Sequence, residues 1–208
     1  MQTVRMPPGA VRTSDGFETF TEEELAQTLK QQCQLRPHLA AVTEFLSLTG
    51  LRWSERRALR VSDLHQNPFP AIRVARAHSE SYQEGGTKNG RVRLVPLTRR
   101  AGELAVARTV GRNPDDYLFT SATGLQLRGE PFRRIIAWST TTPRGRTIHD
   151  LRHYAASAWL RAGIPVHQVS QWLGHSNPST TLKFYAHVLG EEQDIAAIAQ
   201  LDARAADR

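Results

Sequence analysis

The stretch TIHDLRHYAASAWLRAGIPVHQVSQWLGHSNPSTTLKFYAH, residues 147–187, organises the rest of this chain. It gathers side chains that bind metals or phosphates: His149, Arg152, His153, His175, Tyr185 and His187. Glycine and proline boundaries divide the stretch into three predicted helices: about 149–160 ending at Gly163, 165–173 ending at Gly174, and one that begins after Asn177-Pro178 and carries Tyr185. A cluster of this kind either binds a metal ion or handles a phosphate group.

Composition indicates one globular domain with an anionic partner. The chain has 208 residues and a formal net charge of +7, which favours a polyanion, most commonly nucleic acid. Cys33 is the only cysteine, so the sequence offers no disulfide and no cysteine zinc site. It contains neither an apolar run long enough to span a membrane nor a signal peptide, and we expect a cytoplasmic protein of bacterial or phage origin without a membrane partner.

Upstream of this stretch, the first 19 residues have the composition of a linker or arm. The spacing of Thr21 and Glu24 predicts a capped helix, and a second helix is expected from Pro37 to Gly50, where a left-handed cap would end it. Arg52 follows on the turn that Gly50 permits. Ser54 is expected to cap a short helix that carries Ala58 and Leu59, and Glu55 either pairs with Arg52 or orients the turn.

The middle of the chain predicts a small sheet. AIRVARA, residues 71–77, alternates as an edge strand would, and Asn89-Gly90 predicts a hairpin turn between Lys88 and the arm at 91–95. From its position alone, Lys88 would be interpreted as a solvent-exposed lysine of the turn, and Arg52 as a surface cation.

Three further segments connect this region to the histidine-rich stretch: a helix at 98–110 with Leu104, Ala105 and Ala107 inward, an extended segment at 117–120, and a helix at 129–140 with Phe132, Ile135 and Ile136 inward.

A zinc site and a phosphate site make opposite demands on Arg152. His149 and His153 lie four residues apart on one helical face, as in a zinc-binding H-E-x-x-H helix, but here the sequence reads HDLRH. Arg152 shares that face and would set a permanent cation against the metal. A phosphodiester removes the objection, because it would bind Arg152 and also Arg52 and Lys88 brought from elsewhere in the fold. We therefore expect no metal.

Tyr185 supplies the nucleophile that a phosphate site needs. A phenol has a pKa of about 10, so roughly one in a thousand is ionised at neutral pH unless cations assist. Attack on phosphorus would form a phosphotyrosine ester and expel a sugar hydroxyl, to which Lys88 is the candidate proton donor. Because the ester stores the phosphodiester bond, strands can be rejoined without ATP or any other cofactor.

These residues resemble the catalytic domain of the tyrosine recombinases, the phage integrase family. The resemblance covers residues from about 20 to 190 and rests on four motifs: TGLRWSE with Arg52, TKNGRVRLVPL with Lys88, HDLRH with His149 and Arg152, and LGHSNPSTTLKFYAH with His175 and Tyr185. It implies a mainly α fold with a small antiparallel β-sheet (α+β), an arm at 1–19, a catalytic domain at 20–188 and a C-terminal helix at 189–208.

The resemblance also implies an activity and roles. The chain would be a site-specific DNA recombinase, an integrase that cleaves and rejoins strands through a 3′-phosphotyrosine intermediate. Arg52 and Arg152 would grip the scissile phosphate, His175 would hydrogen-bond it, and His149 would assist proton transfer from Tyr185.

Other prominent side chains are outside this set. We expect His153 to pack its helix, His187 to form local hydrogen bonds beside the tyrosine, and Trp159 and Trp172 to belong to the core.

The implied partners are double-stranded DNA, further copies of the chain in a tetramer on DNA, and accessory DNA-bending or directionality proteins. The apolar stripe Ile195, Ile198 and Leu201 is the candidate contact with a neighbouring protomer. Candidate DNA contacts, most of which could equally be solvated surface, are Arg91, Arg93, Arg133, Arg134, Arg144 and Arg146. The helical domain that precedes the catalytic domain in this family is missing here, so the chain is either a fragment or an unusually short enzyme.

Two alternatives remain open from the sequence. A type IB topoisomerase uses a similar residue set to relax supercoils, and a non-catalytic DNA-binding regulator could be built on the same fold. HDLRH and the LGHSNPS turn favour the recombinase over the topoisomerase, and the complete set of six positions argues against the regulator.

Overall fold

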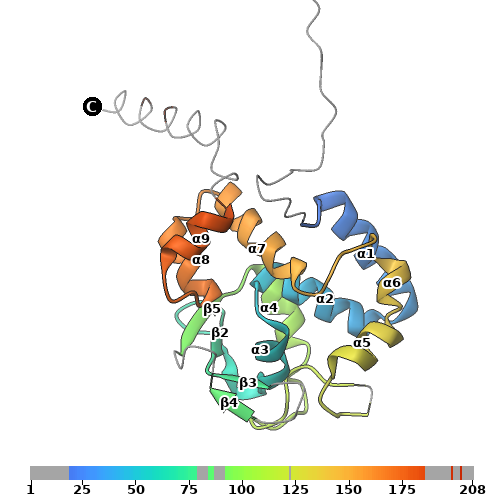
Figure 1. Cartoon of the computed structure of the whole chain (residues 1–208). Helices are drawn as coiled ribbons and strands as arrows, with labels where there is room; N and C mark the ends of the chain where they lie inside the picture. The colour runs from blue at the N-terminus through green and yellow to red at the C-terminus, as the bar shows by residue number, and fades with distance from the viewer. Residues whose placement is uncertain are drawn as a thin grey trace, which may run out of the picture.

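The computed structural model describes residues 19–78, 84–86, 92–121, 123–185, 198 and 202. Within these ranges, the fold contains mostly helices, with a three-stranded antiparallel sheet and a two-stranded antiparallel pair gathered at one side of them (Figure 1). The predicted fold class, mainly α with a small antiparallel sheet, is confirmed. No helix of the described ranges has both the length and the apolar character needed to cross a membrane.

The two N-terminal helices form as their capping signals predict. Helix α1 spans Glu22–Leu35; the Thr21 hydroxyl accepts the Glu24 amide and the Glu24 carboxylate accepts the Thr21 amide, both at 3.1 Å. Helix α2 spans Pro37–Thr49 and ends at Gly50, whose φ of 59° is the expected left-handed cap. Both predictions are confirmed.

Helix α3, Trp53–Ala58, begins differently from the prediction. Arg52 is its N-cap residue, and the Glu55 carboxylate accepts the Arg52 backbone amide at 2.8 Å. The predicted Ser54 cap is wrong, because Glu55 reaches back to satisfy the first free amide of the helix. A short 3₁₀ turn, η1 at Val61–Asp63, leads from this helix to the sheet.

The larger sheet has the order β1-β2-β5, with the strands Leu64–His65, Ala71–Val74 and Arg93–Pro96. Strand β2 is therefore central, and the predicted edge strand is wrong. Ile72 and Val74 are buried while Arg73 is exposed. The alternation therefore reflects a solvent-exposed face of a central strand and does not mark an edge strand. Strands β3, Arg76–His78, and β4, Glu84–Gly86, form the second pair. The predicted hairpin tip with Lys88 lies outside the described residues.

Helix α4, Arg99–Val106, begins at Thr98, whose hydroxyl accepts the Ala101 amide at 3.3 Å. Leu104 and Ala105 are buried as expected, whereas Ala107 lies past the helix and is exposed. The segment 117–120 forms isolated bridges at its two ends, with bends at Leu118 and Phe119 between them.

The helix predicted at 129–140 is two helices, α5 at Gly129–Ile135 and α6 at Trp138–Thr141. Ala137 separates them with a left-handed φ of 52°. The break turns Ile136 into the core and leaves Ile135 44% exposed, which corrects the inward prediction for Ile135.

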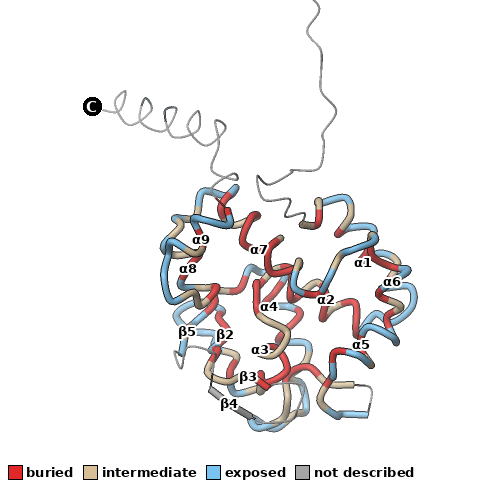
Figure 2. The backbone as a smooth tube through the Cα atoms, viewed as in Figure 1, coloured by how far each residue is buried: buried red, intermediate tan, exposed pale blue. Residues whose placement is uncertain are grey.

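The histidine-rich stretch forms α7, Asp150–Arg161, α8, Val166–Leu173, and α9, Pro178–Tyr185, as predicted to within a residue or two. Helix α7 packs on α2 in the buried centre of the molecule (Figures 1 and 2). A small second core beneath α9 contains Ala156, Leu160, Val169, Leu173 and Tyr185. Trp159 and Trp172 pack edge to face, with centroids 5.3 Å apart, against the cores as expected.

Candidate active site

Arg152 lies at the centre of the site, on the first turn of α7. It is 3% exposed, and its guanidinium donates from Nη1 to the Gly50 carbonyl at 2.7 Å and from Nη2 to the Leu173 carbonyl at 2.5 Å. These carbonyls end α2 and α8, where helices leave acceptors unpaired and carry partial negative charge. Burial and the Arg52 cation lower the pKa of Arg152, but only to about 9, so it stays charged at neutral pH. One buried cation therefore joins the ends of two helices.

Gly50 allows the end of α2 to approach α7 and α8. A Cβ at this position would lie 3.1 Å from both Leu173 Cδ2 and Trp159 Cη2, which is tighter than ordinary contact. A small residue in a left-handed turn is thus needed to bring the Gly50 carbonyl onto Arg152.

Glu55 holds two arginines, one on each side of its carboxylate. Arg93 donates to Oε1 at 3.0 Å and to Oε2 at 2.8 Å, and Arg52 donates to Oε1 at 2.9 Å. Burial would raise the pKa of Glu55, but the hydrogen bonds and charges of Arg93, with those of Arg52, hold it below its ordinary value. The Arg93 Nε also donates to the Trp172 carbonyl at 2.7 Å. Arg93 thereby connects β5, α3 and the end of α8.

Gly174 follows that end of α8, and its backbone is in contact with the Arg93 guanidinium. A Cβ on Gly174 would lie 2.9 Å from Arg93 Nη1, and its φ is 69°. The turn that presents His175 is therefore fixed by a glycine against an arginine of the sheet.

Two histidines face this cationic centre. His149 is the N-cap residue of α7 and is exposed, and His175 hydrogen-bonds Thr181 through Nδ1 at 2.8 Å. Partial burial and the Arg152 charge lower the pKa of His149, and the same two causes lower the pKa of His175 to about 4. Both imidazoles are neutral at pH 7 and can accept or donate a hydrogen bond.

Tyr185, at the end of α9, is 3% exposed, and its hydroxyl lies 2.5 Å from Nδ1 of His153. Burial raises the pKa of the Tyr185 phenol, and the Arg152 charge offsets part of that rise. Burial and the neighbouring His149 lower the pKa of His153 to about 3. The phenol is therefore protonated and its partner is uncharged.

The model of the phage integrase family matches residues 18–192. The chain belongs to the phage integrase family. It is 33% identical over 156 residues to a tyrosine recombinase of Pseudothermotoga lettingae, a match over 71% of this chain and 49% of that protein. It is 32% identical over 159 residues to tyrosine recombinase XerD of Listeria monocytogenes, over 71% and 49% of the two chains. The chain thus spans about half the length of the curated relatives it matches.

Solved structures agree with this assignment at the level of the fold. The Tn1549 transposon integrase, determined in complex with circular intermediate DNA, superposes with a TM-score of 0.71 and 22% identity over 88% of this chain and 66% of that one. The catalytic domain of bacteriophage HP1 integrase gives a TM-score of 0.61 and 23% identity over 87% and 93% of the two chains. The tyrosine recombinase catalytic-domain fold predicted from the motifs is confirmed.

The integrase fold brings five of the six predicted site residues together, namely Arg52, His149, Arg152, His175 and Tyr185. The sixth, Lys88, lies outside the described residues, as do His187 and most of the predicted C-terminal stripe; Ile198 of that stripe is 58% exposed. Among the described residues, no three His, Cys, Asp or Glu side chains gather in a group that could hold a metal ion.

The sequence predicts one neighbour of these site residues and does not identify the roles of two others. The predicted pairing of Glu55 with Arg52 is confirmed. Arg93 is expected from the sequence only as a DNA contact, and His153 only as helix packing. The signal for His153 was present, since its i+4 spacing places it on the same helical face as His149. Nothing local to Arg93 marks it, because its partners Glu55 and Trp172 are distant in sequence.

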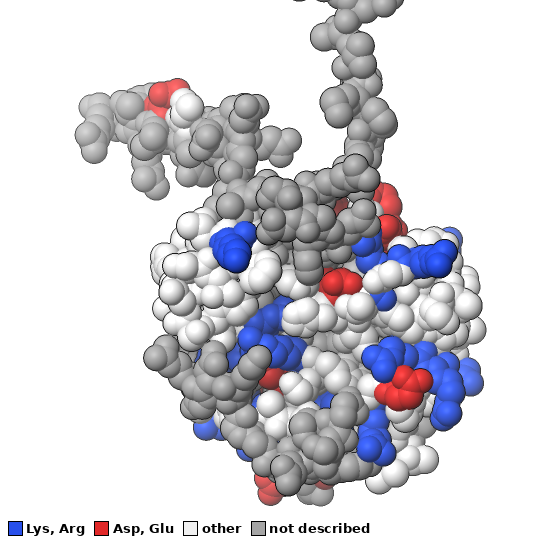
Figure 3. Space-filling view, in the orientation of Figure 1, with Lys and Arg blue, Asp and Glu red and all other residues white. Residues whose placement is uncertain are grey.

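The predicted DNA contacts separate into buried and exposed arginines. The side chains of Arg93 and Arg146 are 10% and 8% exposed, and Arg146 donates to the Glu24 carboxylate at 2.9 Å. Both are structural in this fold. Arg133, Arg134 and Arg144 are exposed, and a basic cluster with an acidic group beside it lies over α5 in Figure 3, where Arg133 pairs with Glu130 at 2.8 Å. Arg91 is outside the described residues.

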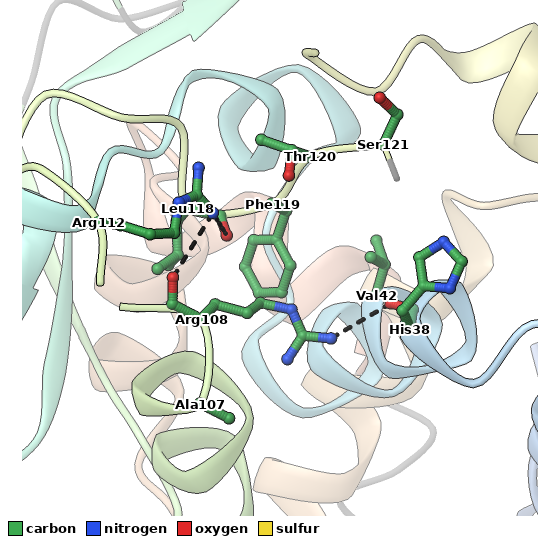
Figure 4. Close-up of a pocket in the computed structure, with 9 residues that line it drawn as sticks. All are labelled: His38, Val42, Ala107, Arg108, Arg112, Leu118, Phe119, Thr120 and Ser121. Carbon is green, nitrogen blue, oxygen red and sulfur yellow. Dashed lines mark hydrogen bonds between the residues drawn. The ribbon is translucent and has the colours of Figure 1, made fainter. Parts of the chain in front are cut away.

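A pocket of about 400 Å³ lies toward the other end of α2, lined by His38, Val42, Arg108 and Phe119 among others (Figure 4). Arg108 crosses it and donates to the His38 carbonyl at 3.2 Å, with its guanidinium 5.0 Å from the centroid of the Phe119 ring. Arg112 donates to the Leu118 carbonyl at 3.3 Å. These arginines tie the backbone together there, away from the cluster around Arg152.

Proposed function

We propose that this chain supplies the chemistry of a site-specific DNA recombinase. Tyr185 attacks a DNA phosphodiester, forms a bond between its oxygen and phosphorus, and releases the 5′-oxygen of the next nucleotide, leaving a 3′-phosphotyrosine. Attack by a 5′-hydroxyl then reverses these bond changes and frees the tyrosine. The observation that carries the proposal is the cluster of Arg52, Arg152 and the two neutral histidines His149 and His175, with Tyr185 near enough for the Arg152 charge to act on its phenol.

The arginines suit charge stabilisation. Arg152 is fixed by two carbonyls, and further N–H groups of its guanidinium remain to meet phosphate oxygens. Arg52 is oriented by Glu55, and its side chain is 24% exposed. Donors held in place before the reaction do not have to reorganise as charge develops, and losing one such donor costs about 3 kcal/mol in known enzymes.

Protons must leave Tyr185 and reach the departing 5′-oxygen. His149, neutral and exposed at the N-terminus of α7, is suited to accept the phenolic proton. We assign donation to the leaving oxygen to Lys88. No metal or cofactor enters these steps, because the guanidinium groups supply the positive charge.

Double-stranded DNA is the proposed substrate. The net charge of +7 and the exposed Arg133, Arg134 and Arg144 support this, as does the structural likeness to the Tn1549 integrase, which was determined in complex with DNA. Assembly into a tetramer through residues 189–208, accessory DNA-bending or directionality proteins, and a cytoplasmic site of action are parts of the same proposal.

The test is covalent capture on nicked DNA. Duplexes randomised around a nick are incubated with the protein in EDTA. Cleavage near the nick releases a short strand that diffuses away, so the tyrosine ester cannot be reversed and accumulates. Wild type should give complexes that survive denaturation and share a sequence, whereas Tyr185→Phe should give none. The exposed Phe184→Tyr, combined with Tyr185→Phe, is a matched control that moves the phenol by one position.

Two outcomes would contradict the proposal. One is the absence of a wild-type complex, and the other is a complex that persists in Tyr185→Phe. Strong relaxation of supercoiled plasmid without any shared site among the captured duplexes would favour a topoisomerase instead.

A further inference from the structure

Arg93 is a nearly buried arginine that contacts the supports of two proposed phosphate contacts. Its side chain is 10% exposed. Its Nη1 and Nη2 donate to the Glu55 carboxylate at 3.0 and 2.8 Å, and its Nε donates to the Trp172 carbonyl at 2.7 Å. The same carboxylate accepts from the Arg52 guanidinium at 2.9 Å, and Trp172 lies at the end of α8, just before the turn that carries His175.

We propose that Arg93 is a positioning residue that holds Arg52 and His175 in fixed relative positions, so that both side chains can meet the same phosphate. This inference rests on the proposed function for the phosphate as their common ligand. The placement of the two side chains in the protein without DNA is a separate claim, and it can be measured by itself.

The carbonyl end of α8 depends on Arg93. The last four carbonyls of a helix have no partner within the helix. Backbone amides of the following turn bond two of those of α8, each at 3.0 Å. The other two, of Trp172 and Leu173, accept from Arg93 at 2.7 Å and from Arg152 at 2.5 Å. The direction in which the chain leaves α8 is therefore set by arginines of two other elements.

The Arg93 guanidinium also packs directly against the turn after α8. A Cβ on Gly174 would lie 2.9 Å from Nη1, 3.0 Å from Cζ and 3.1 Å from Nε of Arg93. His175 is the next residue. The group that bonds the Glu55 carboxylate on one side thus limits, on the other, where the backbone of His175 can lie.

The third argument is the rigidity of this connection. Arg93 pairs with Val74 of the central strand β2, and Val74 is fully buried, so the backbone from which the side chain extends is fixed. A guanidinium carries its donors in one rigid plane, whereas the lysine ammonium is a compact charge on a flexible stem. Lysine in place of Arg93 keeps the charge but cannot bond both carboxylate oxygens and the Trp172 carbonyl in this arrangement.

An NMR titration measures the placement of His175 without DNA. Burial and the cations Arg152, Arg52 and Arg93 lower its pKa to about 4, and a protonated His149 would add to them. The Cε1–H resonance of His175, assigned with His175→Gln, should therefore stay constant in wild type from about pH 7.5 to about pH 5.5. Arg93→Lys keeps the charge, so the expected rise of the midpoint by about one unit or more would report release of the imidazole toward water.

Arg146→Lys is the matched control. Arg146 is also a nearly buried arginine whose Nε and Nη2 donate to one carboxylate, that of Glu24 on α1. Its replacement should leave the His175 midpoint at the wild-type value. Gly174→Ala perturbs the same contact from the turn, since its Cβ would displace the Arg93 guanidinium, and should raise the midpoint. It carries the same test if Arg93→Lys does not fold.

An unchanged His175 midpoint in Arg93→Lys would overturn the inference, as would an equal rise in Arg146→Lys. Titration needs no cleavage, so these results are independent of the covalent capture that tests the proposed function. In that capture at saturating DNA, Arg93→Lys should form its complex about ten- to a hundredfold more slowly than wild type, as expected for misplaced phosphate contacts. A weaker affinity for DNA with an unchanged maximal rate would make Arg93 a DNA contact and would also overturn the inference.

Discussion

Glu55 is expected to be the most sensitive charged residue of the site, because two arginines depend on it. Replacing it by Gln leaves Arg93, 10% exposed, without a counter-charge, and removes the carboxylate that orients the 24% exposed Arg52. Removing one partner of a buried ion pair costs about 3–5 kcal/mol. The Arg52 pair, whose arginine is partly open to solvent, should add about 1 kcal/mol at most. We expect Glu55→Gln to lower the free energy of unfolding by about 3–5 kcal/mol.

The arginine variants give the matched comparison. Arg93→Met leaves Glu55 paired with Arg52 and loses the bond to the Trp172 carbonyl, so a cost of about 2–3 kcal/mol is expected. Arg52→Met should cost about 1 kcal/mol or less. The double variant Glu55→Gln/Arg93→Met should cost less than the sum of the single variants by about 1–3 kcal/mol, because the unpaired cation is gone.

Urea unfolding at pH 7, followed by circular dichroism, measures these differences. A loss of about 1 kcal/mol or less for Glu55→Gln would refute the reasoning, as would strict additivity in the double variant. Either result would mean that water reaches the pair and screens it, despite the burial of Glu55.

Three further changes have expected outcomes that unfolding experiments can check. The pKa of His153 is about 3 in the folded chain and 6.5 in the unfolded chain. Between these pH values the unfolded chain binds a proton at His153 and the folded chain does not, so the free energy of unfolding falls as the pH drops from about 6.5 toward 3. Between pH 7 and pH 5 this contribution is about 2 kcal/mol, and in urea unfolding His153→Asn should lose less over the same interval. In thermal unfolding, Gly50→Ala should lower the free energy of unfolding by about 2–4 kcal/mol, because Gly50 has a left-handed φ and a Cβ there would lie 3.1 Å from its neighbours. The control Gly163→Ala has a φ of 79° and open space around it, and should lower the free energy of unfolding by about 1 kcal/mol. Thr21→Ala should cost about 1 kcal/mol by loss of the helix cap, and an unchanged urea midpoint would show that the cap contributes nothing.

Local signals in the sequence were enough for much of the fold. Capping residues and glycines predict the limits of α1, α2, α7 and α8, because helix ends are decided by a few neighbouring residues. The incorrect predictions occur where residues distant in sequence determine the local structure. Strand β2 is central because β5 pairs with it, and α5 ends early because Ala137 takes a left-handed turn so that Ile136 reaches the core.

The arginines show the same limit within the site. Sequence alone does not distinguish Arg93 from Arg133: both stand in amphipathic segments and both were candidate DNA contacts. The fold buries one against Glu55 and leaves the other exposed beside Glu130. The difference is set by where α3 meets β5, which no local pattern records.

Arg152 explains why the site and the fold are difficult to separate in this protein. Its guanidinium joins the carbonyl ends of α2 and α8, and both helices end in left-handed glycines, Gly50 and Gly174. Each glycine is followed within two residues by a predicted phosphate contact: Arg52 follows Gly50, and His175 follows Gly174. A cation needed for packing therefore sets the positions of the groups proposed to bind the phosphate. Replacing Arg152 would disturb both at once, so its contribution to chemistry has to be measured through neighbours such as Arg52, whose side chain is 24% exposed.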